Sequence, residues 1–187
     1  MKLTPRQLAL SIAGAVVVVV AIALWFTIGP GRGSKLAPER LTPLASELEG
    51  IRGVYLYFGV PGSDDVAAEY RDVVVKDREA DRVRAIYREL LSGSTGSYES
   101  PFPDGVELLN AYYTSRGSLY LDWNQALVKE FQGGSGRERQ LLASIVLTAA
   151  DNLPDVTEVV LLVEGNPVET IGGHFDVMAP LSVAEWR

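Results

Sequence analysis

The chain has 187 residues, of which 47% are hydrophobic and 9% aromatic, and it contains no cysteine. This length and composition fit one compact domain with a small attachment and exclude a wholly disordered chain. The lack of cysteine excludes disulfide frameworks, thiolate metal sites, cysteine nucleophiles and lipid attachment through a cysteine.

Charge is distributed unevenly along the chain. There are 17 Lys and Arg residues against 24 Asp and Glu, a net charge of -7, yet residues 1–40 hold five basic groups and a single acid, Glu39. The body that follows is therefore acidic. Its dense basic group consists of arginines interleaved with acids on a predicted helix: Arg78, Arg82, Arg84 and Arg88. A solvated helix face explains this pattern, and we predict no nucleic-acid binding.

Residues 8–28 form a run of 21 residues without a charge. As a helix the run is about 31 Å long, which matches a hydrocarbon core of about 30 Å. We predict a transmembrane signal anchor, with residues 1–7 as a cytoplasmic tail and the body on the outer side of the cytoplasmic membrane. A cleaved signal peptide, suggested by the small-x-small spacing of Ala21 and Ala23, and a buried core helix are the alternatives. Residues 29–50 are rich in Gly and Pro and are predicted to be a tether.

The body begins with strand and helix patterns. Apolar side chains alternate with tyrosines over residues 54–58, which predicts a strand with one buried face. Three successive valines predict a second strand at residues 70–75. Apolar residues then recur at helical spacing over residues 83–91, opposite the arginines, so we predict an amphipathic helix that ends at Gly93.

The second half of the body continues this alternation. The patterns predict, in chain order, strands at 106–114 and 118–122 joined by a turn at Arg116-Gly117, a short helix within 123–131, a long helix from Ser135 to Asn152, a strand at 156–163, a turn at 165–167 and a return strand at 168–171. Ser135 followed by Glu138 is a capping-box pattern, in which the glutamate reaches back to the helix start. The fold class predicted is α+β: a single small layered domain over residues 51–187, with a mixed or antiparallel sheet and two main helices packed on one side of it.

Short segments spread over nearly the whole body share an order and spacing with a known family. They are Leu56-Tyr57-Phe58, Glu89-Leu90-Leu91-Ser92-Gly93, Pro103-Asp104-Gly105, Leu119 to Asp122, Phe131 with Gly134-Ser135 and Glu138, Ile145-Val146-Leu147-Thr148, Val163-Glu164-Gly165, and Gly173-His174-Phe175-Asp176 with Pro180-Leu181. Together they resemble the GerMN domain, a family named for bacterial sporulation and spore-germination proteins. The resemblance implies an envelope protein with a small α/β domain used for assembly or contact with cell-wall machinery, and no established catalysis. Because the sequence has no lipobox cysteine, the apolar run would be the anchor.

The closing segment supplies the candidate contact residues Gly173, His174, Asp176, Pro180 and Leu181. His174 is the only histidine, so a triad or a two-histidine metal site would need a partner chain. We expect residues 172–181 to fold back onto the sheet and seat Phe175, Val177 and Leu181, while His174 and Asp176 bind backbone groups. Contact with a ligand or partner, and an acid–base pair of His174 with Asp176, are the alternatives.

Other clusters favour structural roles. Asp64-Asp65 lies in a predicted turn and lacks the alternating acids of a calcium loop. Gly133-Gly134-Ser135-Gly136 lacks the lysine of a P-loop, so helix entry is favoured over anion binding. Six aromatic residues are expected mostly in the core, with a sugar-stacking or protein-contact surface as the alternative: Tyr98, Phe102, Tyr112, Tyr113, Tyr120 and Trp123.

These patterns predict no catalytic residue, no cofactor and no metal site. The leading hypothesis is a non-catalytic binding or assembly module that contacts envelope proteins or peptidoglycan and is linked to cell-wall, sporulation or germination machinery. The alternative is a peptidoglycan-modifying glycan hydrolase in which Glu99 and Asp104 face one cleft.

Overall fold

The structure is a computed structural model that describes residues 49–76 and 78–187. These residues belong to one compact unit. The predicted anchor at residues 8–28 and all but the last two residues of the predicted tether lie outside the described residues. Within the described part of the chain, no helix has the length and apolar character needed to cross a membrane.

Two long strands form the first sheet. β1 (Glu49–Gly59) and β2 (Val66–Lys76) pair antiparallel along their whole length. Val54, Leu56 and Phe58 are buried, as the alternating pattern predicts. Both strands are longer than predicted, and β1 includes the last two residues of the predicted tether.

The second sheet contains three main strands, β3 (Leu108–Tyr113), β4 (Ser118–Trp123) and β5 (Glu158–Val163), in that order. β3 and β4 are antiparallel, whereas β4 and β5 are parallel. The predicted turn between β3 and β4 is confirmed, because Gly117 has a φ of 92°, a conformation that glycine adopts without strain.

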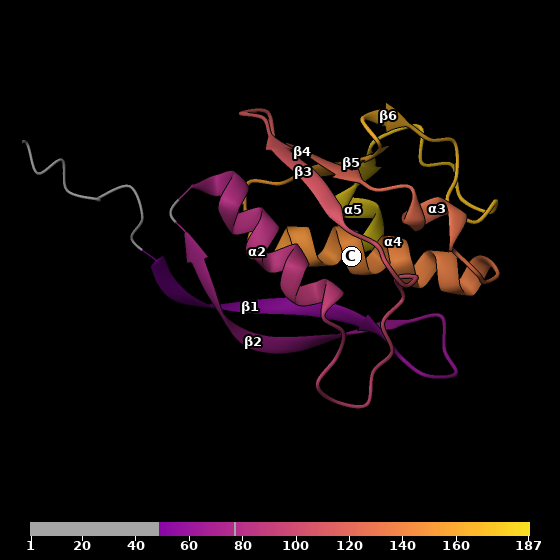
Figure 1. Ribbon diagram of the computed structural model, residues 1–187, viewed down its shortest axis with the longest axis horizontal. Helices are drawn as coiled ribbons and strands as arrows, with labels where there is room; N and C mark the ends of the chain where they lie inside the picture. Colours follow the sequence, from indigo (N-terminus) through magenta and orange to yellow (C-terminus); the bar gives the residue numbers. More distant parts are fainter. Residues whose placement is uncertain (1–48, 77) are drawn as a thin grey trace, which may run out of the picture. The chain divides into compact units, whose positions relative to one another are not determined.

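Two helices occupy the space between the sheets. α2 (Glu79–Leu91) packs on β2 and on β3, and α4 (Ser135–Asn152) packs mainly on β1. The domain therefore has three layers, with helices in the middle (Figure 1). The α+β class is confirmed, but the prediction of one sheet with both helices on one side is wrong, because strand pairing separates β1 and β2 from the other strands.

Four short elements complete the fold: α3 (Ala126–Lys129), β6 (Asn166–Pro167), β7 (Leu181–Ser182) and α5 (Val183–Trp186). The predicted turn at 165–167 and return strand at 168–171 are wrong. Glu164 and Gly165 both have positive φ and form the turn, so the return strand is only β6. It ends at Pro167, which has no N–H to donate to the ladder.

The core lies on both sides of the helical layer. Trp123 and Tyr87 are its largest fully buried side chains, and their rings meet edge to face with centroids 5.7 Å apart. The hydroxyl of Tyr87 donates to the carbonyl of Ile145 on α4 at 2.8 Å. This bond ties α2 to α4 through the core, because a buried hydroxyl needs a partner.

One edge of β1 is closed by side chains of α4 rather than by a strand. Ser144 donates to the carbonyl of Tyr57 at 2.6 Å, and Thr148 accepts from its N–H at 3.2 Å. Asn152 makes both bonds with Tyr55, at 2.7 and 3.0 Å. Further along the same face of α4, the side-chain amide of Gln140 donates to three backbone carbonyls of the turn after β1. The stripe consists of residues four apart: Gln140, Ser144, Thr148 and Asn152.

Candidate functional site

Glu138 is a buried carboxylate near the start of α4. The predicted capping box with Ser135 does not form, because Gly134 precedes the helix and no side chain caps it. The side chain of Glu138 is 0% exposed and contacts residues 170–174 instead. The capping-box prediction is therefore wrong, and the glutamate instead binds the terminal segment, 32 to 36 positions later in the sequence.

The Glu138 carboxylate accepts hydrogen bonds from one continuous stretch of chain. Its Oε1 accepts from the hydroxyl of Thr170 at 2.9 Å and from the N–H groups of Ile171 and Gly172 at 3.2 and 2.8 Å. Its Oε2 accepts from the N–H of His174 at 2.9 Å and lies 3.0 Å from the ring Nδ1. These amides would otherwise need a strand partner, which explains why the predicted return strand is not formed.

These contacts fix the charge of the carboxylate. Burial alone would raise the pKa of Glu138, but hydrogen bonds from Gly172, Thr170 and His174 outweigh burial and hold the pKa below its ordinary value. The group is thus ionised at neutral pH, with both oxygens occupied. A general base must be within reach of a substrate proton, so we assign Glu138 the structural role of fastening the terminal segment.

His174 contacts this carboxylate through both its backbone and its ring. The ring is 41% exposed and its Nδ1 faces Glu138, so the expectation that the side chain binds a backbone group is wrong. Asp176 does bind backbone, because its Oδ1 accepts from the N–H of Met178 at 2.9 Å. Gly173, His174 and Asp176 line one cavity of about 420 Å³.

The terminal segment folds back as expected. Val177 is buried, and Leu181 is buried and pairs with Val159 of β5. Phe175 is half-buried and lies against Trp186, with ring centroids 6.3 Å apart. Pro180 is exposed and does not line the cavity beside His174.

The two acids proposed for glycan hydrolysis have different surroundings. Glu99 forms a backbone bridge with Gly59. Asp104 lines a hollow of about 250 Å³ whose other charged lining residues are Glu130 and Arg137. The cavity geometry therefore does not bring Glu99 and Asp104 into one site. In the described part of the chain, no three His, Asp or Glu side chains are placed to hold a metal ion.

An apolar face on the β1–β2 hairpin is the most exposed hydrophobic feature among the described residues. Its side chains are 46% to 74% exposed, and we call it the hairpin face: Ile51, Tyr55, Tyr70 and Val74. Ile51 is paired with Val74 and Tyr55 with Tyr70 across the strands, and the two tyrosine rings are 5.3 Å apart. Cross-strand apolar pairs stabilise a sheet, but these four side chains remain exposed.

Sequence reasoning did not identify the hairpin face. A sequence signal for it does exist, because residues 73–75 are all apolar. A half-buried strand needs apolar residues at alternate positions only, so an unbroken apolar run places at least one of them on the exposed face. The predicted aromatic cluster is divided by the structure. Phe102 and Trp123 are buried, as expected, whereas Tyr112 is exposed on β3.

The fold and the site define a small three-layer α+β domain in which the buried Glu138 carboxylate binds the terminal segment of the same domain. The model of the Germane family, described as sporulation and spore germination, matches residues 55–169. The chain belongs to this family, which confirms the resemblance seen in its sequence. The matched range ends before the Gly-His-x-Asp segment.

Solved structures show the same fold. A Clostridium perfringens protein described as a lipoprotein is 21% identical, with a TM-score of 0.50, and the match covers 73% of this chain and 90% of that one. The tandem GerMN domains of the sporulation protein GerM from Bacillus subtilis are 23% identical, with a TM-score of 0.52, and the match covers 71% of this chain and 44% of that one. No curated protein matches the chain.

Proposed function

We propose that the protein is a non-catalytic binding module of the bacterial cell envelope. In this proposal residues 8–28 anchor it in the cytoplasmic membrane, and the body lies on the outer side and contacts an envelope protein of the cell-wall or sporulation machinery. The uncharged run supports the anchor. The family description supports the link to sporulation and germination.

The hairpin face carries the proposal of protein contact. Exposed apolar side chains that gather on one strand pair commonly mark a binding surface, and tyrosines are enriched at protein interfaces. The edge of β1 is closed by α4, so a partner meets either the hairpin face or the outer edge of β2. Among the described strands, β1 is the only one that pairs with β2.

Site-specific photo-crosslinking in intact cells tests this proposal. A photoreactive residue in place of Ile51 or Val74 should crosslink to one envelope protein, identified by mass spectrometry. The same residue in place of Leu109, an exposed apolar position on β3, should not. Crosslinks that are absent from the hairpin face, or equally frequent from Leu109, would contradict the proposal.

A matched pair of tyrosine variants tests the energetic role of the face. Tyr70 and Tyr112 are 60% and 57% exposed, so truncating either removes a similar apolar area. Tyr70→Ala should weaken binding of the crosslinked partner by more than about tenfold, as interface tyrosines often do, and Tyr112→Ala should leave it unchanged. Equal effects would refute the assignment of the face.

Two further assays address topology and the alternative activity. Protease added to intact spheroplasts should degrade the body and spare residues 1–7. Incubation of peptidoglycan with the protein should release no soluble muropeptides. Release that is lost in Glu99→Gln or Asp104→Asn would favour the hydrolase.

A further inference from the structure

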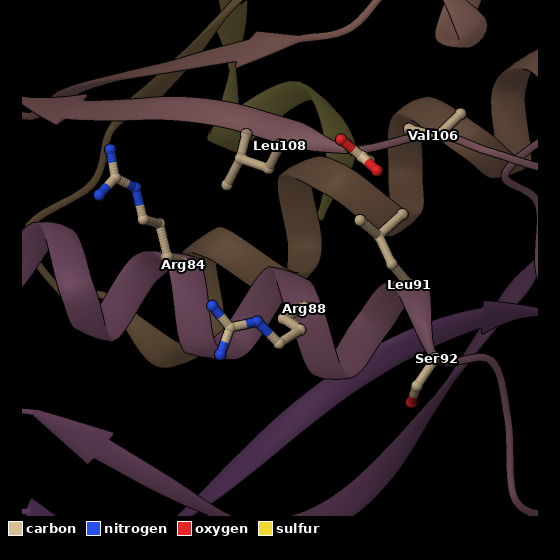
Figure 2. A pocket seen from close by; sticks show the side chains of 7 residues that line it. Arg84, Arg88, Leu91, Ser92, Val106 and Leu108 are labelled. Atoms are coloured by element: carbon tan, nitrogen blue, oxygen red, sulfur yellow. The ribbon is translucent and has the colours of Figure 1, made fainter.

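A cavity of about 450 Å³ lies between the C-terminal half of α2 and the segment that leads into β3 (Figure 2). Arg84 and Arg88 line it from successive turns of α2, and Val106, Glu107 and Leu108 line it from the other side. Its volume falls within the range of about 300–1,000 Å³ that is usual for small-ligand sites. It is formed by different residues from the hairpin face and the His174 cavity.

The arginines of this cavity lack an anionic partner within the described residues. The ion pairs found there join Arg71, His174 and Arg187 to acids, and none involves Arg84 or Arg88. The Nη2 of Arg84 donates to the Oδ1 of Asn110 at 3.2 Å, which orients its guanidinium.

Two cations four residues apart in an acidic chain make a local site for an anion. The side chains of Arg84 and Arg88 both extend from α2 beside the cavity (Figure 2). A carboxylate can accept several hydrogen bonds from such guanidinium groups.

The wall opposite the arginines is held in place by Asn124. Its N–H donates to the carbonyl of Glu107 at 3.0 Å, and its Oδ1 accepts from the N–H of Glu107 at 3.2 Å. Its side-chain amide also donates to the carbonyl of Gly105 at 2.8 Å. The wall is thus fixed before any ligand arrives, which reduces the entropy lost on binding.

The remaining lining is partly apolar. Leu91, Val106 and Leu108 contribute alkyl groups, and Leu91 lies one turn beyond Arg88 on α2. The cavity therefore combines two cations and a leucine on the wall formed by α2 with an acid and two apolar side chains on the opposite wall.

We propose that this cavity binds a short peptide with free termini and an alkyl side chain. Arg84 and Arg88 bind its carboxylate, Glu107 faces its ammonium group, and the alkyl side chain contacts Leu91 and Val106. The carboxylate of Glu107 disfavours a dianion such as phosphate by repulsion. This site does not depend on the partner proposed for the hairpin face.

Titration calorimetry on the full-length chain, purified in mild detergent because of its apolar run, tests the proposal. The probes are the tripeptide Ala-Leu-Ala with free termini, the same peptide with an amidated C-terminus, and inorganic phosphate. We expect the free tripeptide to bind with a Kd of about 1 mM or tighter. The amidated peptide should bind at least about tenfold more weakly, because it lacks the charged acceptor, and phosphate should bind more weakly than the free tripeptide.

Variants then locate the site. Arg84→Gln and Arg88→Gln should each weaken the binding of the free tripeptide by about tenfold or more. Arg116→Gln, which removes the same charge from an exposed turn, should not. Arg84→Gln also removes the hydrogen bond to Asn110. If that loss unfolds the protein, Arg88→Gln still tests the proposal. In an NMR titration, the amide signals of Val106 and Leu108 should shift.

Three results with the tripeptides would overturn the proposal. They are absence of binding at a tripeptide concentration of about 10 mM, equal binding of the free and amidated peptides, and unchanged affinity in Arg88→Gln. Tighter binding of phosphate than of the tripeptide would also overturn it and would assign the arginines to a simple anion.

Discussion

Replacing Glu138 with glutamine should weaken the domain far more than this small change of side chain would on the surface. The carboxylate is fully buried, and both its oxygens accept bonds from the terminal segment. A glutamine side chain fits the same space but has only one acceptor oxygen. Its other terminal atom is an NH₂ group that donates rather than accepts.

The magnitude follows from the least costly orientation of the amide. If the amide oxygen takes the place of Oε1, it retains three donors, and its NH₂ group faces the N–H of His174. A buried N–H left unpaired costs about 1–3 kcal/mol, and each retained bond falls from a charged value of about 1.5–3 to a neutral value of about 0.5–1.5 kcal/mol. Together these values give a loss of about 4–7 kcal/mol, from a total stability of about 5–15 kcal/mol.

Urea denaturation of the body, followed by tryptophan fluorescence, measures this loss as a shift of the midpoint at constant slope. Glu130→Gln, at an exposed position, is the matched control and should stay within about 0.5 kcal/mol of the wild type. His174→Ala should cost about 1 kcal/mol, because its backbone N–H still bonds to the carboxylate. A cost below about 1 kcal/mol for Glu138→Gln would refute the role assigned to this residue.

Three further predictions concern packing, the edge of β1 and acid stability. A Cβ at Gly172 would lie 2.5 Å from the ring of Phe131, so Gly172→Ala should lower the melting temperature through a loss of about 1–3 kcal/mol, whereas Gly50→Ala on β1, with nothing within 4 Å, should not. Thr148→Val should cost about 1–3 kcal/mol in urea denaturation, because it leaves a backbone N–H of β1 unpaired. Burial would raise the pKa of Glu69, but hydrogen bonds from neighbouring hydroxyl and guanidinium groups lower it to about 2 from 4.5. Because the folded pKa lies below the unfolded one, this stabilisation is complete above pH 4.5 and is lost as the pH falls towards 2. In urea denaturation across that range, the free energy of unfolding should therefore fall less in Glu69→Gln than in the wild type.

The elements with strong local signals were predictable from the sequence. Both ends of α4 are confirmed, because Gly133-Gly134 and Asn152-Leu153-Pro154 interrupt helical structure on either side. The alternation in residues 54–58 correctly identified the buried face of β1. The two-residue strands and the four-residue helix α5 have too few residues to show a period.

Long-range contacts explain what the sequence did not predict. Ser135 and Glu138 have capping-box spacing, but residues more than thirty positions away offer the glutamate more donors. The same contacts prevent a strand at 168–171. The division into two sheets likewise depends on which strands pair, and periodicity carries no information about pairing partners.

The polar stripe on α4 has a consequence for the order in which the chain folds. Residues 49–76 emerge early in synthesis, and the side chains that close the edge of β1 lie 87 to 97 positions later for Tyr55 and Tyr57. Until α4 docks, the newly synthesised β1–β2 hairpin has unpaired backbone groups at both edges and apolar side chains on both faces. Strands from different chains associate under these conditions. A nascent chain of this protein therefore needs shielding, by a holdase or by fast synthesis of the segment that contains α4.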